Sequence, residues 1–213
     1  MTIRARLLAA IVLTVLGPLV TIGVALSAFG TLGDRFEEVE RASAHEGLSL
    51  DLKFAVTDMN GWQTAYGYDG GRSRPRFVAS ARHTEELLAR ARRELTTPRE
   101  RALLAELGDA FDAFMALDED AWQALQDGRT AETKRILLGP ELDHFETMAR
   151  AAGELAAEQD RRSVAAATEF DGERDDARRE LVAVAIGAGV VIVLLLLTVQ
   201  DVVRLALERR DET

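Results

Sequence analysis

A run of twenty uncharged residues near the end of the sequence, 181–200, constrains the fold more than any other feature. Only Thr198 and Gln200 are polar in this run, and every other residue is aliphatic, alanine or glycine. A helix rises 1.5 Å per residue, so the run is about 30 Å long, the thickness of the hydrocarbon core of a bilayer. A buried core helix is the alternative, but it would need a large soluble core on every side. The sequence therefore predicts a membrane-spanning helix at 181–200.

Residues 7–33 form a second apolar run, which contains 27 residues and no charge. Arginines precede it and small residues occur near its end, as in a cleaved signal peptide. The run exceeds the usual length of the apolar region of a signal peptide, which favours an uncleaved transmembrane helix. Cleavage of 7–33 is the alternative that the sequence leaves open.

Arginine near the membrane ends predicts the orientation, because positive residues favour the cytoplasmic side. Arginines flank the outer ends of both runs: Arg4, Arg6, Arg204, Arg209 and Arg210. We therefore expect a two-pass protein of the cell membrane (the inner or plasma membrane), with segments 1–6 and 201–213 in the cytoplasm. Residues 34–180 would then form one extracytoplasmic domain.

The charge of this middle part excludes several classes of function. Residues 34–180 carry 32 acidic and 21 basic residues, a net charge of −11. Nucleic-acid binding needs clustered Lys and Arg, so it is excluded, as is lying flat on anionic lipid. The chain has no Cys, and therefore no disulfide, thiol nucleophile or thiolate metal site. We see no phosphate-binding glycine loop and no nucleophile with a partnered base, so we expect neither an enzyme nor a cofactor.

Apolar residues in the middle part recur at alternating spacings of four and three, the pattern of helices that each bury one stripe. The four stripes run over Leu48–Tyr66, Phe77–Leu95, Leu104–Leu125 and Leu142–Phe170. Turn signals separate them at Asp69–Pro75, Thr97-Pro98, Asp127-Gly128 and Gly139-Pro140. We expect an all-α fold, an extracytoplasmic up-down-up-down four-helix bundle whose first and last helices continue into the membrane spans.

Local signals refine the third helix. Thr97 is predicted to be its N-cap, with Glu100 closing a capping box and Gly128 following its end. A short helical segment is expected at 130–138. Asp118 falls on the apolar stripe, but the neighbouring Leu117 fits the spacing equally well, so we expect Leu117 to point inward and Asp118 to face water.

Two segments carry a resemblance to a known family. The first is Asp58–Tyr66, with the sequence DMNGWQTAY, and the second is Ile136–Leu142, ILLGPEL, followed by Phe145. With two spans around a helical domain, the chain resembles the N-terminal sensor half of bacterial methyl-accepting chemotaxis receptors of the four-helix-bundle type. The resemblance implies a homodimer that binds a small ligand outside the cell and moves its second span by a small piston or rotation.

Receptors of that family continue beyond the second span into a HAMP linker and a long cytoplasmic coiled coil. The thirteen residues 201–213 are too few for either part. We therefore expect a sensor module without its own output domain, which assembles as a homodimer or with other chemoreceptors or membrane proteins.

A metal site is not expected. At 1.5 Å per residue along the predicted helices, His45, His83 and His144 stand about 16, 40 and 54 Å from the membrane, too far apart to share an ion.

The same helix arithmetic places one group of polar and aromatic side chains at a common height. Rings, amides and cations in one layer suit a small carboxylate or amino-acid-like ligand. The candidate ligand-binding residues are Asn60, Trp62, Gln63, Tyr66, Arg82, His83, Phe111 and Phe114. The alternative is that Trp62 is a core residue, and that the amides are satisfied across the bundle.

The leading prediction is a membrane-anchored, chemoreceptor-like sensor module that detects a small extracytoplasmic ligand and transmits the signal across the membrane. One alternative is a two-span scaffold that assembles with other membrane proteins and binds no ligand, and another is a receptor gene fragment. Small residues in the second span, Ala183, Ala185, Gly187 and Gly189, permit close approach of helices in a dimer. The alternative is that they serve packing of the two spans within one chain.

Overall fold

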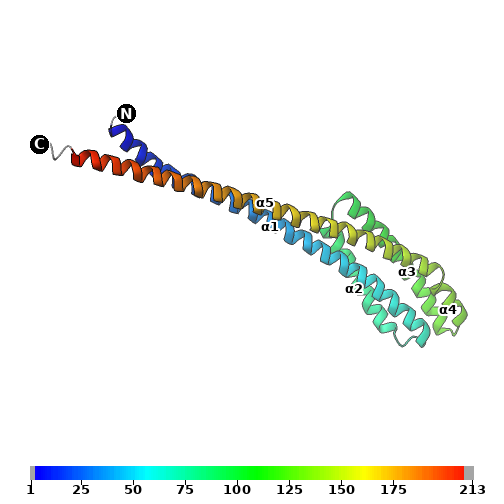
Figure 1. Cartoon of the computed structure of the whole chain (residues 1–213). Helices are drawn as coiled ribbons and strands as arrows, with labels where there is room; N and C mark the ends of the chain where they lie inside the picture. Colours follow the sequence, from blue (N-terminus) through cyan, green and yellow to red (C-terminus); the bar gives the residue numbers. More distant parts are fainter. Residues whose placement is uncertain (1–2, 209–213) are drawn as a thin grey trace. The chain divides into compact units, whose positions relative to one another are not determined.

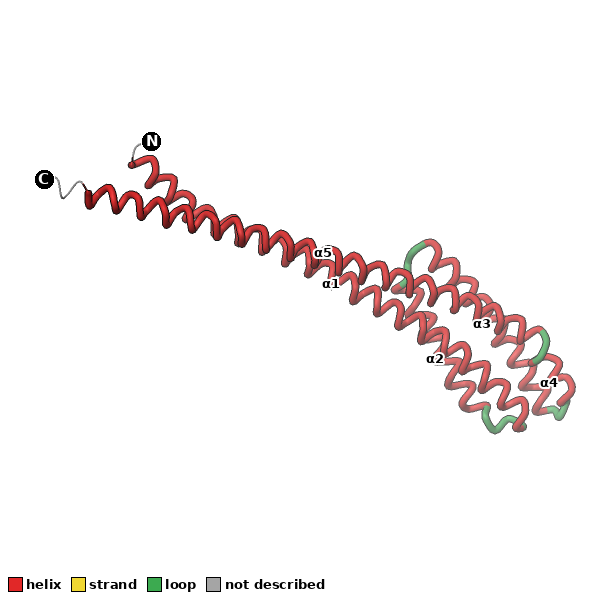
Figure 2. The backbone as a smooth tube through the Cα atoms, in the orientation of Figure 1, coloured by secondary structure: helices red, strands yellow, loops and turns green. Residues whose placement is uncertain are grey.

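The computed structural model describes the backbone of residues 3–208 and the side chains of residues 12, 14–200 and 204. The helices, labelled in Figure 1, are α1 (Ile3–Asp69), α2 (Arg74–Glu94), α3 (Pro98–Gln126), α4 (Thr130–Leu137) and α5 (Pro140–Glu208). Short loops join them, as Figure 2 shows. Residues 3–208 contain no β-strand, so the predicted all-α class is confirmed.

The described chain divides into two compact units. The helical unit comprises residues 39–166, and the apolar unit comprises the described residues up to Glu38 and from Ala167 onward. The helices α2, α3 and α4 belong to the helical unit. The helices α1 and α5 are each divided, with one part in the helical unit and the other in the apolar unit.

The core of the helical unit is shared by α1, α2, α3 and α5. One buried cluster combines Leu52, Leu88, Leu104 and Leu155, one from each of these helices, with their apolar neighbours. A second cluster combines Met59, Phe77, Phe114 and Met148 in the same way. Every residue of the stripes predicted for α1 and α2 is buried except Trp62, which is half-buried. The heptad spacing therefore identified the inner faces of these two helices correctly.

Further along α5 the predicted Ala152, Ala156 and Gln159 are buried, but in the first turns of the helix the buried face is displaced by one position from the predicted stripe. Met148, Ala151 and Leu155 are buried together with Glu141, whereas the predicted Leu142 and Ala149 are half-buried. A one-residue shift rotates a helix face by about 100°, because a helix has 3.6 residues per turn. The consequence is that a carboxyl group, rather than a leucine, enters the core at the start of α5.

Two of the connections need glycine. Gly71 has a φ of +93° and its N–H donates to Tyr66 O at 2.9 Å, which closes the end of α1. A Cβ at Gly71 would lie 2.8 Å from the ring of Trp122, so this turn packs directly on α3. Gly128, with a φ of +74°, ends α3 as predicted. At the other end of α3 the predicted capping box between Thr97 and Glu100 is present.

The apolar unit contains two helical segments that are long and apolar enough to cross a membrane. The mean hydropathy of the most apolar stretch is 1.9 in α1 and 3.0 in α5, and 6% and 0% of these stretches is buried. The hydroxyls of Thr21 and Thr198 donate to the carbonyls of Gly17 and Leu194, one turn earlier, which satisfies them without water. The exposure of these apolar side chains is the reverse of what a soluble core helix shows.

Candidate functional site: a buried polar network

Five polar side chains meet inside the helical unit. Two of them belong to the starts of α2 and α5, and the α1–α2, α3–α4 and α4–α5 connections lie at the same end of the unit (Figure 2). We call the five side chains the polar network: Gln63, Tyr66, Arg74, Asp118 and Glu141. Four are at most 1% exposed, and the side chain of Arg74 is 14% exposed. Because α1, α2, α3 and α5 each supply a member, the network ties together all the helices that share the core.

Helical periodicity brings these residues together. Gln63 and Tyr66 are three residues apart on α1, so they lie on one face of the helix. Arg74 is the first residue of α2, directly after the tight turn at Gly71. Asp118 lies on the buried stripe of α3, and Glu141 is the second residue of α5. The α1–α2 and α4–α5 connections thus deliver Arg74 and Glu141 to the core beside the C-terminal half of α3.

Asp118 forms the ionic half of the network. The Tyr66 hydroxyl donates to Oδ1 at 2.5 Å, and the Arg74 guanidinium donates to Oδ2. Both carboxylate oxygens therefore accept, which is the arrangement of an ionised group. Burial raises the pKa of Asp118 above its usual value, and the hydrogen bonds from Arg74 and Tyr66 oppose that rise.

Three rings surround the Arg74 guanidinium. Its central carbon lies 5.0, 4.8 and 5.1 Å from the ring centroids of Tyr66, Phe77 and Trp122. Cation–π attraction and the ion pair with Asp118 act together in this desolvated setting. Arg74 is consequently held in place by groups from three helices.

The placement of Asp118 corrects the sequence analysis. We expected it to face water, whereas it is 1% exposed and Leu117 is half-buried. A buried carboxylate needs a cation or several donors, and here Arg74 and Tyr66 supply both. The sequence-based argument failed because Arg74, which directly follows a turn, gave no sign of reaching α3.

Glu141 and Gln63 form the second half of the polar network, and no arginine or lysine among the described side chains pairs with the Glu141 carboxyl group. Gln63 Nε2 donates to Glu141 Oε1, and Glu141 Oε2 is buried without a hydrogen-bond partner. Burial raises the pKa of Glu141 to about 8, and the negative charge of Asp118 acts in the same direction. The start of a helix favours an ionised carboxylate by about 0.3–1 kcal/mol. That is less than the 1.4 kcal/mol of one pKa unit, so burial dominates and Glu141 is neutral at pH 7.

A second buried glutamate, at the opposite end of α3, shows what Glu141 lacks. Glu100 Oε1 accepts from Gln159 Nε2 and Arg162 Nη1, each at 2.7 Å, and Oε2 accepts from the Thr97 N–H at 2.8 Å. Burial raises the pKa of Glu100, but these hydrogen bonds outweigh it, and the net shift is downward. Both glutamates are buried beside a glutamine, and the difference between them is the arginine and the backbone donor.

The eight candidate ligand-binding residues do not line one common pocket in the structure. Gln63 and Tyr66 belong to the polar network, and Phe111 and Phe114 are buried in the apolar core around it. Trp62 and Asn60 are half-buried, and the Arg76 guanidinium lies 4.6 Å from the centroid of the Trp62 ring. Arg82 and His83 are exposed. The cations expected beside the aromatic wall therefore point to solvent, and apolar side chains fill the layer.

Two members of the network were missed by the sequence analysis, Arg74 and Glu141. A signal existed for Glu141, because it precedes the buried Met148 and Leu155 by seven and fourteen residues, a heptad spacing. The neighbouring Leu142 obscured this signal, since hydrophobicity alone favours the leucine. No comparable pattern identifies Arg74.

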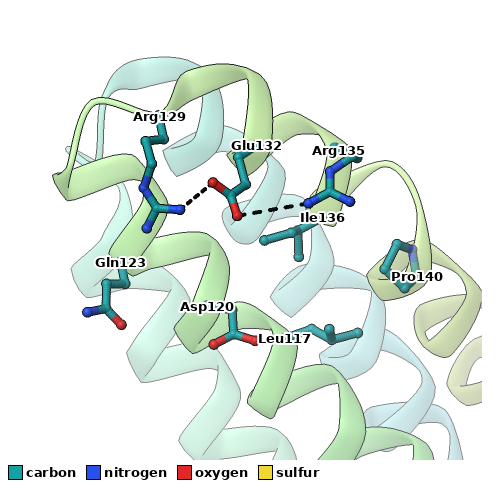
Figure 3. A pocket seen from close by; sticks show the side chains of 8 residues that line it. All are labelled: Leu117, Asp120, Gln123, Arg129, Glu132, Arg135, Ile136 and Pro140. Carbon is teal, nitrogen blue, oxygen red and sulfur yellow. Dashed lines mark hydrogen bonds and ion pairs between the residues drawn. The ribbon is translucent and has the colours of Figure 1, made fainter.

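A surface hollow lies between the C-terminal half of α3 and α4, and Figure 3 shows its lining. The Glu132 carboxylate lies between Arg129 and Arg135, with its Oε1 3.9 Å from the Arg135 guanidinium. The lining side chains are exposed or half-buried, so water weakens these charge interactions. Pro140, at the rim of the hollow, directly precedes Glu141 in the chain. The buried polar network is therefore the stronger candidate site.

Comparisons with protein-family models, with curated proteins and with solved structures found no match to this chain. The resemblance to chemotaxis receptors thus stays a prediction from the sequence.

The ion pair in the network predicts an unequal response to two arginine substitutions on α2. Arg74→Gln leaves Asp118 buried without a countercharge and should destabilise the helical unit by about 3–5 kcal/mol. Arg76→Gln removes only a stacked cation on an exposed face and should cost less than about 1 kcal/mol. Both tryptophans of the chain, Trp62 and Trp122, lie in the helical unit, so their fluorescence reports its unfolding in the full chain in detergent. Equal losses in the two variants would contradict the assigned role of Arg74.

The raised pKa of Glu141 predicts a stability that falls as the pH rises. The folded protein keeps a proton up to about pH 8 that the unfolded chain releases from about pH 4.5. The stabilisation linked to this proton is complete below pH 4.5 and is lost between pH 4.5 and 8, at up to about 1.4 kcal/mol per pH unit. The pKa values of Glu94, Glu100 and Glu158 are lowered, so the stability that these groups contribute is lost only as the pH falls below this window.

Unfolding curves of the full chain between pH 5 and 8.5 would measure this slope. Glu141→Gln cannot ionise and should flatten the slope in this window, whereas Glu146→Gln, at an exposed position of the same helix, should leave it unchanged. A wild-type slope that persists in Glu141→Gln would show that another group carries the proton.

Proposed function

We propose that the protein is a membrane-anchored sensor module that transmits an extracytoplasmic signal. In this proposal the helical unit is an extracytoplasmic up-down-up-down four-helix bundle, and α1 and α5 cross the membrane with both termini in the cytoplasm. The supporting observation is the continuity of two helices. Each runs without a break between a candidate span and the helical unit, α1 over 67 residues and α5 over 69.

The polar network couples α1 to α5 through a hydrogen bond. Gln63 lies near the C-terminal end of α1, and Glu141 lies in the first turn of α5. Their hydrogen bond joins the very helices that contain the candidate spans. A change in that bond would alter how α1 packs against α5, and unbroken helices carry small shifts over long distances. This coupling is what a transmembrane signalling module requires.

The chemistry of the network also favours a signalling role over a purely structural one. Buried ionisable groups seldom add net stability, because the desolvation of the charges offsets their attraction. Glu141 in particular is buried with one unpaired oxygen, which an apolar side chain of similar size would avoid. Such a group reduces the stability of the fold. A role that needs the carboxyl group to change its charge or its partner would explain why it is present.

A second candidate function is the two-span scaffold, and one observation favours it. The layer around Trp62, where a ligand pocket was expected, is filled by the buried Met59, Phe111 and Phe114. A scaffold would be packed in this way. The sensor proposal therefore moves the responsive site from the Trp62 layer to the polar network, whose α1 members Gln63 and Tyr66 follow Trp62 by one and four residues.

A stripe on the outer face of α1 supports the proposed homodimer. Its residues are all uncharged and exposed, and they follow the spacing of four and three: Ser43, Gly47, Leu50, Phe54, Thr57, Gly61, Thr64 and Tyr68. Phe54 and Tyr68 are 66% and 67% exposed, large fractions for aromatic side chains. Gly47 and Gly61 have open space where a Cβ would stand. A second copy of α1 packed along this stripe would cover the rings and use the glycines for close approach.

The candidate span in α5 has a similar surface. Ala183, Ala185, Gly187 and Gly189 are exposed, and a Cβ added at either glycine would meet no atom within 4 Å. The small residues therefore leave room for another helix to approach closely. This agrees with a dimer in which spans of two copies approach each other.

The proposed topology predicts labelling from opposite sides of the membrane. The chain has no native Cys, so single cysteines at Thr2 and at Arg72, in the α1–α2 turn, report their own positions. A membrane-impermeant maleimide added outside intact cells should label Arg72→Cys, whereas Thr2→Cys should react only after the cells are opened. Labelling of both positions from one side would refute the two-pass arrangement.

The proposed dimer predicts disulfide cross-links along one face of α1. Cysteines at Leu50, Phe54, Thr57 and Gly61 should form intersubunit disulfides in the membrane. Cysteines at Asp51 and Lys53, which are exposed but off the stripe, should not. Equal cross-linking at both sets of positions, or none at either, would exclude a specific interface on this stripe.

A further inference from the structure

Glu141 is the member of the polar network that no other group neutralises. Its Oε1 accepts a hydrogen bond from an uncharged amide, and its Oε2 has no partner. The nearby cation, Arg74, already donates to Asp118 Oδ2 and lies 3.8 Å from Glu119. A proton on the carboxyl group is therefore what keeps a second negative charge out of this part of the core.

Glu141 interacts with groups on α1, α2 and α3. They are Gln63 and Tyr66 on α1, Arg74 on α2, and Asp118 on α3. On α4 the buried side chains are Thr133 and Leu137, while Glu132 is half-buried and Lys134 and Arg135 are exposed. On α5 itself, the half-buried His144 follows one turn later. Two buried carboxyl groups thus share one arginine, which is itself 14% exposed.

We propose that Glu141 is a proton-responsive switch, so that the signal read by this module is a change of external pH. The inference rests on the proposed function, since it names the stimulus of that sensor. At alkaline pH the O–H bond of the Glu141 carboxyl breaks, the proton passes to water, and an unpaired carboxylate is left in the core. Asp118 and Glu141 are then two buried anions, and Arg74, which pairs with Asp118, is the cation near them.

The fold offers a direct way to relieve this charge. The start of α5 has to reach water, because an isolated carboxylate is strongly disfavoured inside a protein. The two-residue α4–α5 connection, residues 138–139, ties α4 to this movement. Leu137 of α4 packs on the backbone of α1 at Gly67, where a Cβ would lie 2.4 Å from Leu137 Cδ1. Exposure of Glu141 would therefore separate both α5 and α4 from the end of α1.

The range of the response follows from the titration of this group. With a pKa of about 8, the ionised fraction of Glu141 rises from about a tenth at pH 7 to about nine tenths at pH 9. Water outside a cell covers this range, and Glu100, held ionised by Arg162 and Thr97, supplies no comparable transition there.

Trp122 provides a reporter beside the network. Its ring lies 5.7 Å from the Tyr66 ring and 5.1 Å from the Arg74 guanidinium carbon. In the full chain carrying Trp62→Phe, reconstituted in lipid nanodiscs, Trp122 is the single tryptophan. Its fluorescence should show a transition between pH 6 and 9.5 with a midpoint near 8. Adding Glu141→Gln should abolish the transition, whereas adding Glu146→Gln or His144→Gln should leave it in place.

A transition that survives Glu141→Gln, or its absence from the parent chain, would overturn the proposal. Infrared difference spectroscopy of the unsubstituted chain gives an answer even if a variant fails to fold. It should detect a protonated carboxyl group at pH 7 that is lost by pH 9.5, and a spectrum without this band at pH 7 would also overturn the proposal.

Cysteine labelling at Arg72 separates this inference from the proposed function. A transition that depends on Glu141, combined with labelling of Arg72→Cys from the cytoplasm, would confirm the proton site and refute external sensing. External labelling without a transition of Trp122 would refute the switch and leave the sensor topology standing.

Discussion

The burial of two carboxyl groups beside one arginine is the constraint on which the helical unit depends. Arg74 and Asp118 neutralise each other, and Tyr66 completes the coordination of Asp118. Glu141 then has to remain neutral, because the countercharge within reach is already paired. Since these groups come from α1, α2, α3 and α5, the protonation state of one side chain is linked to the packing of all four helices.

This constraint explains the arrangement of the rest of the unit. Two apolar clusters, mainly of leucine, alanine, methionine and phenylalanine, form the rest of the core. The network is confined to the end with the α1–α2 and α4–α5 connections, where helix ends allow water to enter with little disruption. The opposite end contains the fully satisfied Glu100, so the two ends of the unit differ in how they respond to charge.

Most of the fold could be predicted from the sequence. The heptad spacing in Leu48–Tyr66 and Phe77–Leu95 identified buried faces, the Thr97 capping box and Gly128 marked the ends of α3, and uncharged runs identified both candidate spans. These signals are local, because each depends on residues within a few turns of one helix.

The candidate site was predictable only in part, because its chemistry depends on partners from different helices. Gln63 and Tyr66 were identified as candidates, but the sequence shows neither that Arg74 reaches Asp118 nor that Glu141 replaces Leu142 in the core. The height of a residue along a helix also does not tell whether its side chain faces the core or the solvent. Arg82 and His83 were placed at the level of Trp62, and both face solvent. Hydrophobicity patterns locate a buried stripe. They wrongly assign to the surface a polar residue that is buried because a cation far away in the sequence pairs with it.

We infer that the Gln63–Glu141 pair is retained for its response to charge and reduces the stability of the fold. Replacing both residues in the double variant Gln63→Leu/Glu141→Leu exchanges a buried, incompletely satisfied polar pair for apolar side chains of similar size. The most direct measurement is the free energy of unfolding of this variant and of the unsubstituted chain at pH 8.5, followed by tryptophan fluorescence in detergent. We expect the double variant to be the more stable of the two. A double variant that is less stable by several kcal/mol would show that the pair is a structural element of the core and is not retained for its response to charge.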